Sequence, residues 1–283
     1  MFSLRRPAIL NPEGYLDLIS GRRRGWIATV QRLLLQLGTV PYATVIAGRN
    51  WLFDRHLKRS HAVSVPVISV GNITVGGTGK TPLVFWLAQW LAQQDQRVTL
   101  ISRGYGSDAE QPNDEALELE QRLPGVPHLL NPNRVQAARR AVEELKSQVI
   151  VLDDGFQHRK VKRDLDIVTI SANDQKEDYR LLPWGKLREP LQNIGRANAA
   201  IFTRTNNYNL PELLPSIEPF IKGELLFSTQ QLTLMKYDED GYRKLLPPEE
   251  ILFAFCGIGE PKSFFDCIVK LGLKSGGKRM FRD

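Results

Sequence analysis

The residues with the clearest chemistry lie at positions 67–81, where an apolar run leads into a glycine-rich loop and then into a helical pattern. Glycines let such a loop turn successive backbone N–H groups toward phosphate oxygens. Lys80 is placed to reach the β- and γ-phosphates of a nucleotide, and the Thr81 hydroxyl to take one position on Mg²⁺. The residues expected to surround the phosphates are Gly76, Gly77, Thr78, Gly79, Lys80 and Thr81.

The loop departs from the strict phosphate-loop pattern at one position, because Thr74 stands where the pattern has its first glycine. We expect Gly76 and Gly77 to supply the missing flexibility. The alternative is a glycine-rich turn that is followed by Lys and Thr by chance. A strand before the loop and a helix after it favour the phosphate loop.

Two carboxylates, Asp153 and Asp154, follow a buried apolar run at 149–152. In an open parallel sheet, ligands bind outside the carboxyl ends of the strands. A carboxylate at that edge, opposite Thr81, can complete the coordination of Mg²⁺ directly or through water. An ordinary turn would explain Asp154 before Gly155 but not Asp153, so we expect a metal role for at least one of the pair.

The positive charge of the chain is concentrated at its N-terminus. The net charge is +7, and residues 1–60 hold ten Lys and Arg against three Asp and Glu, whereas the remainder balances. Apolar residues of this segment fall on one helical face, namely Trp26, Val30, Leu33, Leu34 and Leu37. A basic helix of this kind, with Arg22, Arg23 and Arg24 near its head, favours an anionic lipid surface over nucleic acid. The alternative is a helix that packs on the protein's own core.

Other classes of protein are disfavoured by composition. Cys256 and Cys267 form no close pair and lack matching His spacing, which argues against a disulfide framework and a structural zinc site. No apolar run reaches the length of a membrane span, and the N-terminal apolar stretch has basic residues on both sides without a cleavage site, unlike a signal peptide. A reducing, cytoplasmic setting fits best.

Strand-like runs alternate with helical segments after residue 62, which predicts an α/β fold with a parallel sheet flanked by helices. The expected strands are 65–70, 97–102, 149–152, 165–170 and 199–203, and the expected helices are 81–93 and 134–146. Strand-like runs at 224–228 and 231–237 then lead to a second, smaller unit. In that unit we expect a strand at 251–256 and a helix at 261–271.

Seven short motifs follow one another along the chain. They are Gly71-Asn72, Gly76-Gly-Thr-Gly-Lys-Thr-Pro82, Ser102-Arg-Gly-Tyr-Gly106, Asp114-Glu115, Asp153-Asp-Gly-Phe-Gln-His158, Leu187-Arg-Glu189 and Phe255-Cys-Gly-Ile258. In this order they resemble the tetraacyldisaccharide 4′-kinases of lipid A synthesis. The resemblance runs from about residue 15 to the end, and the phosphate loop together with Asp-Asp-Gly-Phe-Gln-His makes it specific.

This resemblance implies transfer of the γ-phosphate of ATP, with Mg²⁺, to the 4′-hydroxyl of a tetraacyldisaccharide 1-phosphate, which gives lipid IVA. It implies a peripheral enzyme at the cytoplasmic face of the bacterial inner membrane, whose partners are the lipid substrate and the anionic membrane surface, with no nucleic acid and no obligate protein partner. The implied regions are a membrane-associating helical segment over 1–60, a P-loop NTPase-like kinase core over 61–223, and a two-strand linker with a partial α/β domain over 224–283.

The resemblance also implies roles for single residues. Asp114 would be the catalytic carboxylate that accepts the proton of the attacking hydroxyl, with Lys80 beside the phosphates. Glu189 matches a position near the nucleotide and metal, and Arg188 is expected to meet phosphate. For both, a polar loop between two prolines is the alternative.

Residues at the ligand edge of the sheet complete the expected site. Arg103 follows a strand end, and we expect it to contact substrate together with Asn72, although the Gly-Tyr-Gly after Arg103 also suits a turn. His158 is expected to be an ordinary satisfied histidine rather than a residue that supports the site.

The chain departs from the family pattern in two places. The segment before Asp114 is short, and Asn113 stands where the family generally has Gly. The family also continues past Asp283 into an Asp-His-His segment, one histidine of which supports the catalytic carboxylate. We therefore expect a C-terminally incomplete chain that binds ATP but phosphorylates lipid poorly.

Two other functions remain open. One is a nucleotide-driven switch of the GTPase kind, although the Asn-Lys-x-Asp run typical of guanine specificity is absent. The other is an inactive, truncated kinase homologue that still binds nucleotide and membrane.

Overall fold

A computed structural model describes residues 12–104, 119–206, 210–229, 235–238, 241–244, 251–257 and 261–281 of the chain. The chain divides into two compact units, Met1–Ser228 and Thr229–Asp283.

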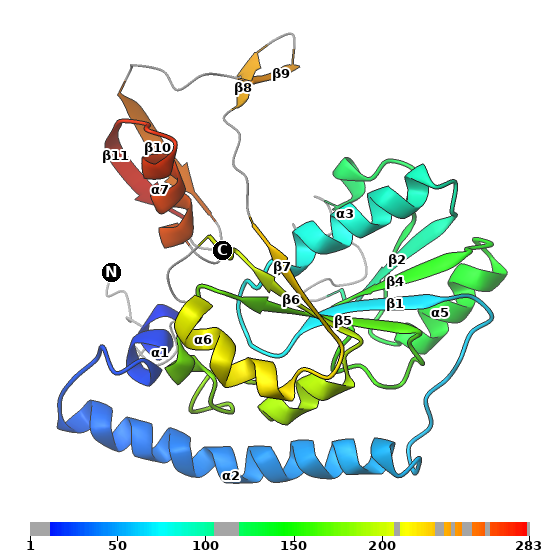
Figure 1. Ribbon diagram of the computed structural model, residues 1–283, viewed down its shortest axis with the longest axis horizontal. Helices are drawn as coiled ribbons and strands as arrows, with labels where there is room; N and C mark the ends of the chain where they lie inside the picture. The colour runs from blue at the N-terminus through cyan, green and yellow to red at the C-terminus, as the bar shows by residue number, and fades with distance from the viewer. Residues whose placement is uncertain are drawn as a thin grey trace, which may run out of the picture. The chain divides into compact units, whose positions relative to one another are not determined.

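The first unit is built on a seven-stranded sheet with the order β3-β2-β4-β1-β5-β6-β7 (Figure 1). All six neighbouring pairs are parallel. The strands are β1 (Val67–Asn72), β2 (Val98–Ser102), β3 (His128–Leu130), β4 (Val149–Asp153), β5 (Leu165–Ser171), β6 (Ala199–Thr203) and β7 (Glu224–Ser228). β1 is central, so the segment that leaves its carboxyl end lies over the middle of the ligand edge.

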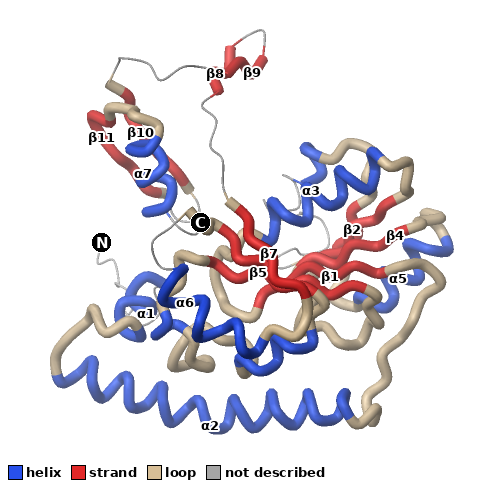
Figure 2. The backbone as a smooth tube through the Cα atoms, in the orientation of Figure 1, coloured by secondary structure: helices blue, strands red, loops and turns tan. Residues whose placement is uncertain are grey.

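Helices cover both faces of this sheet, and Figure 2 shows the strands as one layer between them. They are α3 (Lys80–Gln93), α5 (Arg134–Glu143), α6 (Leu210–Ile217) and the 3-10 helices η2 (Lys176–Asp178), η3 (Leu191–Arg196) and η4 (Glu218–Phe220). α3 packs on the face that carries Val149 and Val151, and α5 packs on the face that carries Ile150 and Leu152. The strands are apolar on both sides because both sides are buried.

Two further helices precede the sheet, α1 (Pro12–Ile19) and α2 (Trp26–Asp54). α2 has 29 residues and continues through Pro41. It lies outside the layered core, on the side of α6 (Figure 1). Within the described part of the chain, we find no helix with the length and apolar character that crossing a membrane requires.

The second unit contains an antiparallel hairpin and a parallel strand pair. The hairpin joins β8 (Met235–Asp238) and β9 (Gly241–Lys244). The pair joins β10 (Leu252–Cys256) and β11 (Ser275–Met280) through α7 (Pro261–Lys270). Ala254, Cys256 and Phe265 form the small core of this α/β element.

The predicted fold class is confirmed, but the predicted boundary at residue 223 needs correction. Residues 224–228, which we placed in a linker, form β7 and pair with β6, so the first unit extends to Ser228. The strand itself was predicted, but its side chains are mostly exposed at the sheet edge, so nothing in the sequence indicated that it pairs with β6. The crossover helix α6 was also missed, because Pro215 lies inside it.

Candidate active site

The phosphate loop connects the end of β1 to the start of α3. Gly79 lies in the left-handed region with φ 79°, and a Cβ there would come within 3.3 Å of Thr203. Gly71 approaches Phe156 so closely that a Cβ would lie 2.6 Å from the Phe156 Cβ. Both positions therefore require glycine, and α3 begins directly after the loop at Lys80. This arrangement directs the N–H groups of the helix start toward the loop, as in an anion-binding site.

Hydroxyl groups hold the loop on the side of β5 and β6. Thr78, which is 2% exposed, places its Oγ1 at 2.8 Å from the Oγ1 of Thr169. Thr203 Oγ1 donates to the Thr78 carbonyl at 2.9 Å, and Arg204 Nη1 donates to the Gly77 carbonyl at 3.0 Å. The Thr78 side chain therefore holds the shape of the loop.

Charged groups hold the loop on the side of β4. Lys80 Nζ lies 2.9 Å from Asp154 Oδ1 and 3.3 Å from Asn72 Oδ1. Arg188 Nη1 donates to both carboxylate oxygens of Asp154, at 3.0 and 2.8 Å. Burial acts to raise the pKa of Asp154, but Lys80 and Arg188 outweigh it and lower that pKa to about 2.

Asp153 has a different environment from its neighbour. Its Oδ2 accepts from Ser102 Oγ at 3.3 Å, whereas its Oδ1 is buried without a hydrogen-bond partner among the described residues. Burial raises the pKa of Asp153, against the lowering effect of Lys80. A buried carboxylate oxygen of this kind is a suitable ligand for a hard cation.

Protein groups alone do not complete a metal site in the part of the chain that the structure describes. No cluster of three or more His, Cys, Asp or Glu side chains is found there. Asp153 and the Thr81 hydroxyl would therefore hold Mg²⁺ together with phosphate oxygens and water, as Mg²⁺ sites commonly do. The residues present fit that ion.

His158 lies among cationic side chains. Its Nε2 is buried without a hydrogen-bond partner among the described residues. Burial lowers the pKa of His158 to about 4, and the charges of Arg134 and Arg103 add to this effect. The ring is therefore neutral near pH 7, and exposed Arg103 is close enough to influence it.

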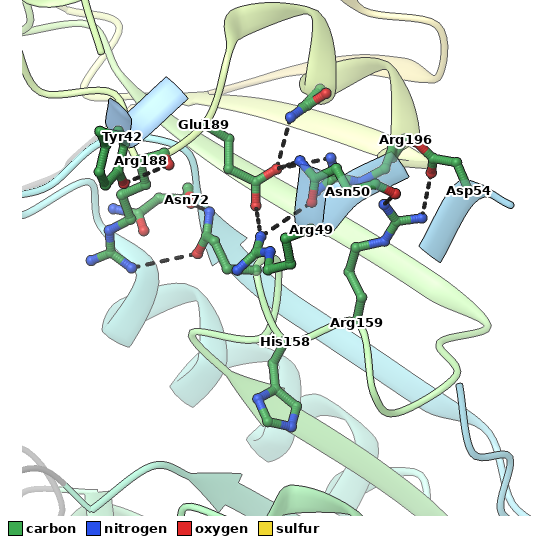
Figure 3. A network of polar contacts seen from close by, with 12 residues as sticks. Tyr42, Arg49, Asn50, Asp54, Asn72, His158, Arg159, Arg188, Glu189 and Arg196 are labelled. Atoms are coloured by element: carbon green, nitrogen blue, oxygen red, sulfur yellow. Dashed lines mark hydrogen bonds and ion pairs between the residues drawn. The ribbon is translucent and has the colours of Figure 1, made fainter. Parts of the chain in front are cut away.

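Glu189 is 0% exposed and is surrounded by donors, as Figure 3 shows. Arg49 Nη2 donates to its Oε1 at 2.8 Å, and Asn50 Nδ2 donates to its Oε2 at 2.9 Å. Asn193 and Arg196 also donate to Oε2, each at 2.9 Å. A buried carboxylate is tolerated here because it is paired and fully hydrogen-bonded.

Comparison with known proteins decides the family. A family model described as tetraacyldisaccharide-1-P 4′-kinase matches residues 30–283. The chain belongs to this kinase family. The resemblance seen in the sequence motifs is thereby confirmed.

Curated relatives and a solved structure agree with the family model. The tetraacyldisaccharide 4′-kinase of Chlorobaculum parvum is 36% identical over 270 residues, which cover 88% of this chain and 74% of that protein. That of Desulfotalea psychrophila is 35% identical over 263 residues, which cover 86% and 75%. The crystal structure of the "apo" form of LpxK from Aquifex aeolicus in complex with ATP has 33% identity and a TM-score of 0.72, and the match covers 89% of this chain and 82% of that one.

The structure brings most of the predicted kinase site together. Lys80, Asn72, Asp154 and Arg188 form one connected group. Glu189 adjoins this group in sequence, but its carboxylate is directed to α2 and η3. Predicted Asp114 lies outside the described residues.

Three residues that contact predicted site residues were not anticipated from the sequence. Arg49 and Asn50 contact Glu189, although the sequence places them in an N-terminal helix 140 and 139 residues away. Arg204 contacts the phosphate loop from the end of β6. Its place directly after a strand on the ligand edge was the available signal, the same one that selected Arg103.

Proposed function

We propose that this chain transfers the γ-phosphate of ATP to the 4′-hydroxyl of a tetraacyldisaccharide 1-phosphate. The observation that carries the proposal is the contact of Lys80 with Asp154 at the start of α3. It is the arrangement that phosphoryl transfer needs, because a movable cation lies beside a glycine-rich loop and an acidic strand end. Membership of the kinase family and the ATP complex of Aquifex aeolicus LpxK support it.

Each residue of the site has a proposed role. Backbone N–H groups of residues 76–81 bind the phosphates, and Lys80 stabilises the charge that develops on the transferred group. Mg²⁺, when bound by Thr81 and Asp153, neutralises phosphate charge. Asp154 and Arg188 set the position of Lys80.

The acceptor side of the reaction rests on residues at the same edge. Asp114 is proposed to accept the proton of the 4′-hydroxyl. Arg103 and Asn72 are proposed to contact the substrate. Glu189 is proposed to support the nucleotide site by fixing the backbone next to Arg188. Arg103 follows β2, next to β4 in the sheet, which supports its place near the transferred phosphate.

A lipid surface is the proposed location of the enzyme, with α2 as the contact. The apolar residues predicted for one helical face are all exposed, namely Trp26, Val30, Leu33, Leu34 and Leu37. A free apolar face beside the basic residues at 22–24 suits the anionic cytoplasmic surface of an inner membrane. A lipid acceptor would reach the site from that surface.

The direct test is transfer of labelled phosphate from ATP to a tetraacyldisaccharide 1-phosphate in detergent. We expect label in the lipid with ATP and Mg²⁺, and none without Mg²⁺. Nucleotide hydrolysis at the same rate without lipid, or with GTP in place of ATP, would support a nucleotide-driven switch instead. Nucleotide binding without any transfer to lipid would support an inactive homologue.

A further inference from the structure

Residues 183–189, which we call the bridging loop, contact the N-terminal helices on one side and the phosphate loop on the other. The loop carries the Leu-Arg-Glu motif at its end. Figure 3 shows this end, with Tyr42 of α2 next to Arg188 and with Arg49 and Asn50 of α2 next to Glu189.

Side chains of α1 and α2 bind the bridging loop through its backbone and its one carboxylate. The Tyr15 hydroxyl donates to the carbonyls of Pro183 and Gly185 at 2.9 and 3.0 Å. The Tyr42 hydroxyl donates to the Arg188 carbonyl at 2.8 Å. Arg49 and Asn50 donate to the buried carboxylate of Glu189 at 2.8 and 2.9 Å. One residue of α1 and three residues in the C-terminal half of α2 therefore bind the same short loop.

The opposite side of the bridging loop pairs with the phosphate loop. Val75 N donates to the Lys186 carbonyl, and Arg188 N donates to the Ile73 carbonyl, both at 2.8 Å. Thr74 and Leu187 form the antiparallel bridge between these two bonds. The first residues of the phosphate loop therefore have their backbone fixed by the bridging loop.

Arg188 extends this connection to the reactive side chains. Its carbonyl accepts from the Tyr42 hydroxyl and its N–H donates to the Ile73 carbonyl, while its guanidinium is paired with Asp154, which is paired with Lys80. A shift of the Arg188 backbone consequently moves a pairing partner of Asp154. A buried, hydrogen-bonded carboxylate next to it resists such a shift, because separating Glu189 from its donors leaves charge without a partner.

We propose that Tyr42, Arg49 and Asn50 of α2 are positioning residues of the nucleotide site. They act through Arg188 and Glu189 on the phosphate loop and on Lys80, so the docking of α2 sets the affinity for nucleotide. The inference rests on the proposed function only in taking ATP as the nucleotide. It gives α2 a second role, because its other face is the one proposed to meet lipid.

The experiment measures the dissociation constant of Mg²⁺-ATP for the full chain in detergent, without lipid acceptor. The test variant is Tyr42→Phe with Arg49→Met, which removes two donors of α2 and leaves Asn50, Asn193 and Arg196 on Glu189. We expect ATP to bind about 5-fold more weakly or worse, the size of an ordinary coupling between sites. A variant with Tyr42→Phe and Arg49→Lys keeps a cationic donor at position 49, and we expect it to bind ATP more tightly than the test variant does, with most of the lost affinity recovered.

The matched control is Arg32→Met, which removes the same charge from the same helix. Arg32 Nε donates to the Ala28 carbonyl within α2, so its loss is expected to change ATP affinity by less than about twofold. Thermal unfolding without nucleotide records the structural cost of each variant. A lower melting temperature for the test variant with unchanged ATP affinity would overturn the inference, because the contacts would then serve stability alone.

A second measurement uses the outward face of α2. Anionic phosphatidylglycerol vesicles without acceptor are expected to change the ATP dissociation constant of the unmodified chain, and ATP to change vesicle binding by the same factor. Both changes should be lost in the test variant. Bound vesicles that leave ATP affinity unchanged in the unmodified chain would contradict the coupling. Failure to bind vesicles counts against the proposed location only, since the comparison of variants in detergent decides the inference.

Discussion

The two sides of the phosphate loop are held by different chemistry. On the side of β4 the contacts are ionic, with Lys80, Asp154 and Arg188 in one group. On the side of β5 and β6 the contacts are mainly through hydroxyl groups, with Thr78 paired to Thr169, together with the Arg204 contact to a backbone carbonyl. We expect the ionic groups to exchange partners when a charged nucleotide binds, whereas the buried hydroxyl pair keeps its hydrogen bond.

This difference separates the groups that serve the reaction from the groups that stabilise the fold around the site. Substitutions on the β4 side should reduce turnover while the fold persists. Substitutions on the hydroxyl side should reduce stability while the chemistry of the remaining folded protein persists. Three substitution experiments test that division in order of decreasing effect, and a fourth concerns the pH dependence of stability.

Lys80→Ala should have the largest effect, because it removes the cation that stabilises the transferred phosphate. We expect turnover to fall at least about 10²-fold, as for loss of a group that stabilises developing charge. Arg188 still pairs with Asp154, so the melting temperature should change little. Kinase assays and thermal unfolding measure the two quantities, with exposed Lys176→Ala as the control. Near-normal turnover would contradict the assignment of residues 76–81 as a phosphate loop.

Asp153→Asn and Asp154→Asn should differ in their response to Mg²⁺. Asp153 has an unpartnered buried oxygen, so Asp153→Asn should raise the Mg²⁺ concentration at half-maximal turnover at least about 10-fold. Asp154 holds Lys80 and Arg188, so Asp154→Asn should lower turnover with a smaller change in Mg²⁺ dependence. Titration of turnover with Mg²⁺ makes the comparison. Equal shifts for the two variants would contradict the division of roles.

Thr169→Val should reduce stability rather than chemistry. The change keeps the shape of the side chain but removes the hydroxyl that lies against Thr78 and donates to the Gly71 carbonyl. We expect a loss of about 1–3 kcal/mol in the free energy of unfolding, because buried polar groups lose their partner. Denaturant unfolding measures it, with exposed Thr44→Val as the control. A large loss of turnover in a variant of unchanged stability would contradict the view that the hydroxyl contacts serve stability alone.

The smallest effect concerns the pH dependence of stability through His158. Its pKa is lowered from 6.5 to about 4 in the folded chain. Between these values the unfolded chain binds more protons, so stability falls as the pH falls through that window. Since His158 is partly exposed, we expect a contribution of about 1 kcal/mol. His158→Gln should flatten the curve there, and a parallel curve would show that other groups cause the slope.

The sequence was a good guide to the parallel sheet. Strands such as 149–152 are apolar on both faces because the strands of a doubly covered sheet are buried throughout, and the structure has the predicted strands of this sheet within one or two residues. β3 was missed, since its three residues are half-buried and carry little periodic signal. Short edge strands are defined by their neighbour more than by their own side chains.

The sequence predicted where the site lies but not the different roles of neighbouring residues in it. Asp153 and Asp154 are adjacent and chemically alike, yet Asp154 has φ 51° and is ion-paired with Lys80, whereas Asp153 contacts Ser102. The two adjacent carboxylates thus have different partners, and the positive φ of Asp154 is not visible in the sequence. Glu189 likewise depends on donors far away in sequence, and no local sequence pattern predicts such a contact.

The distance in sequence between α2 and Glu189 has a consequence for the order of assembly. Arg49 is made 140 residues before its partner. At synthesis rates of roughly 5–20 residues per second, α2 exists for about 7 to 28 s before Glu189 leaves the ribosome. During that time its inner face lacks the Glu189 carboxylate on which it docks, and the proposed lipid surface is available to its apolar face. The core would then fold onto a helix that already lies on lipid, so the timing of synthesis would help to decide where the kinase is assembled.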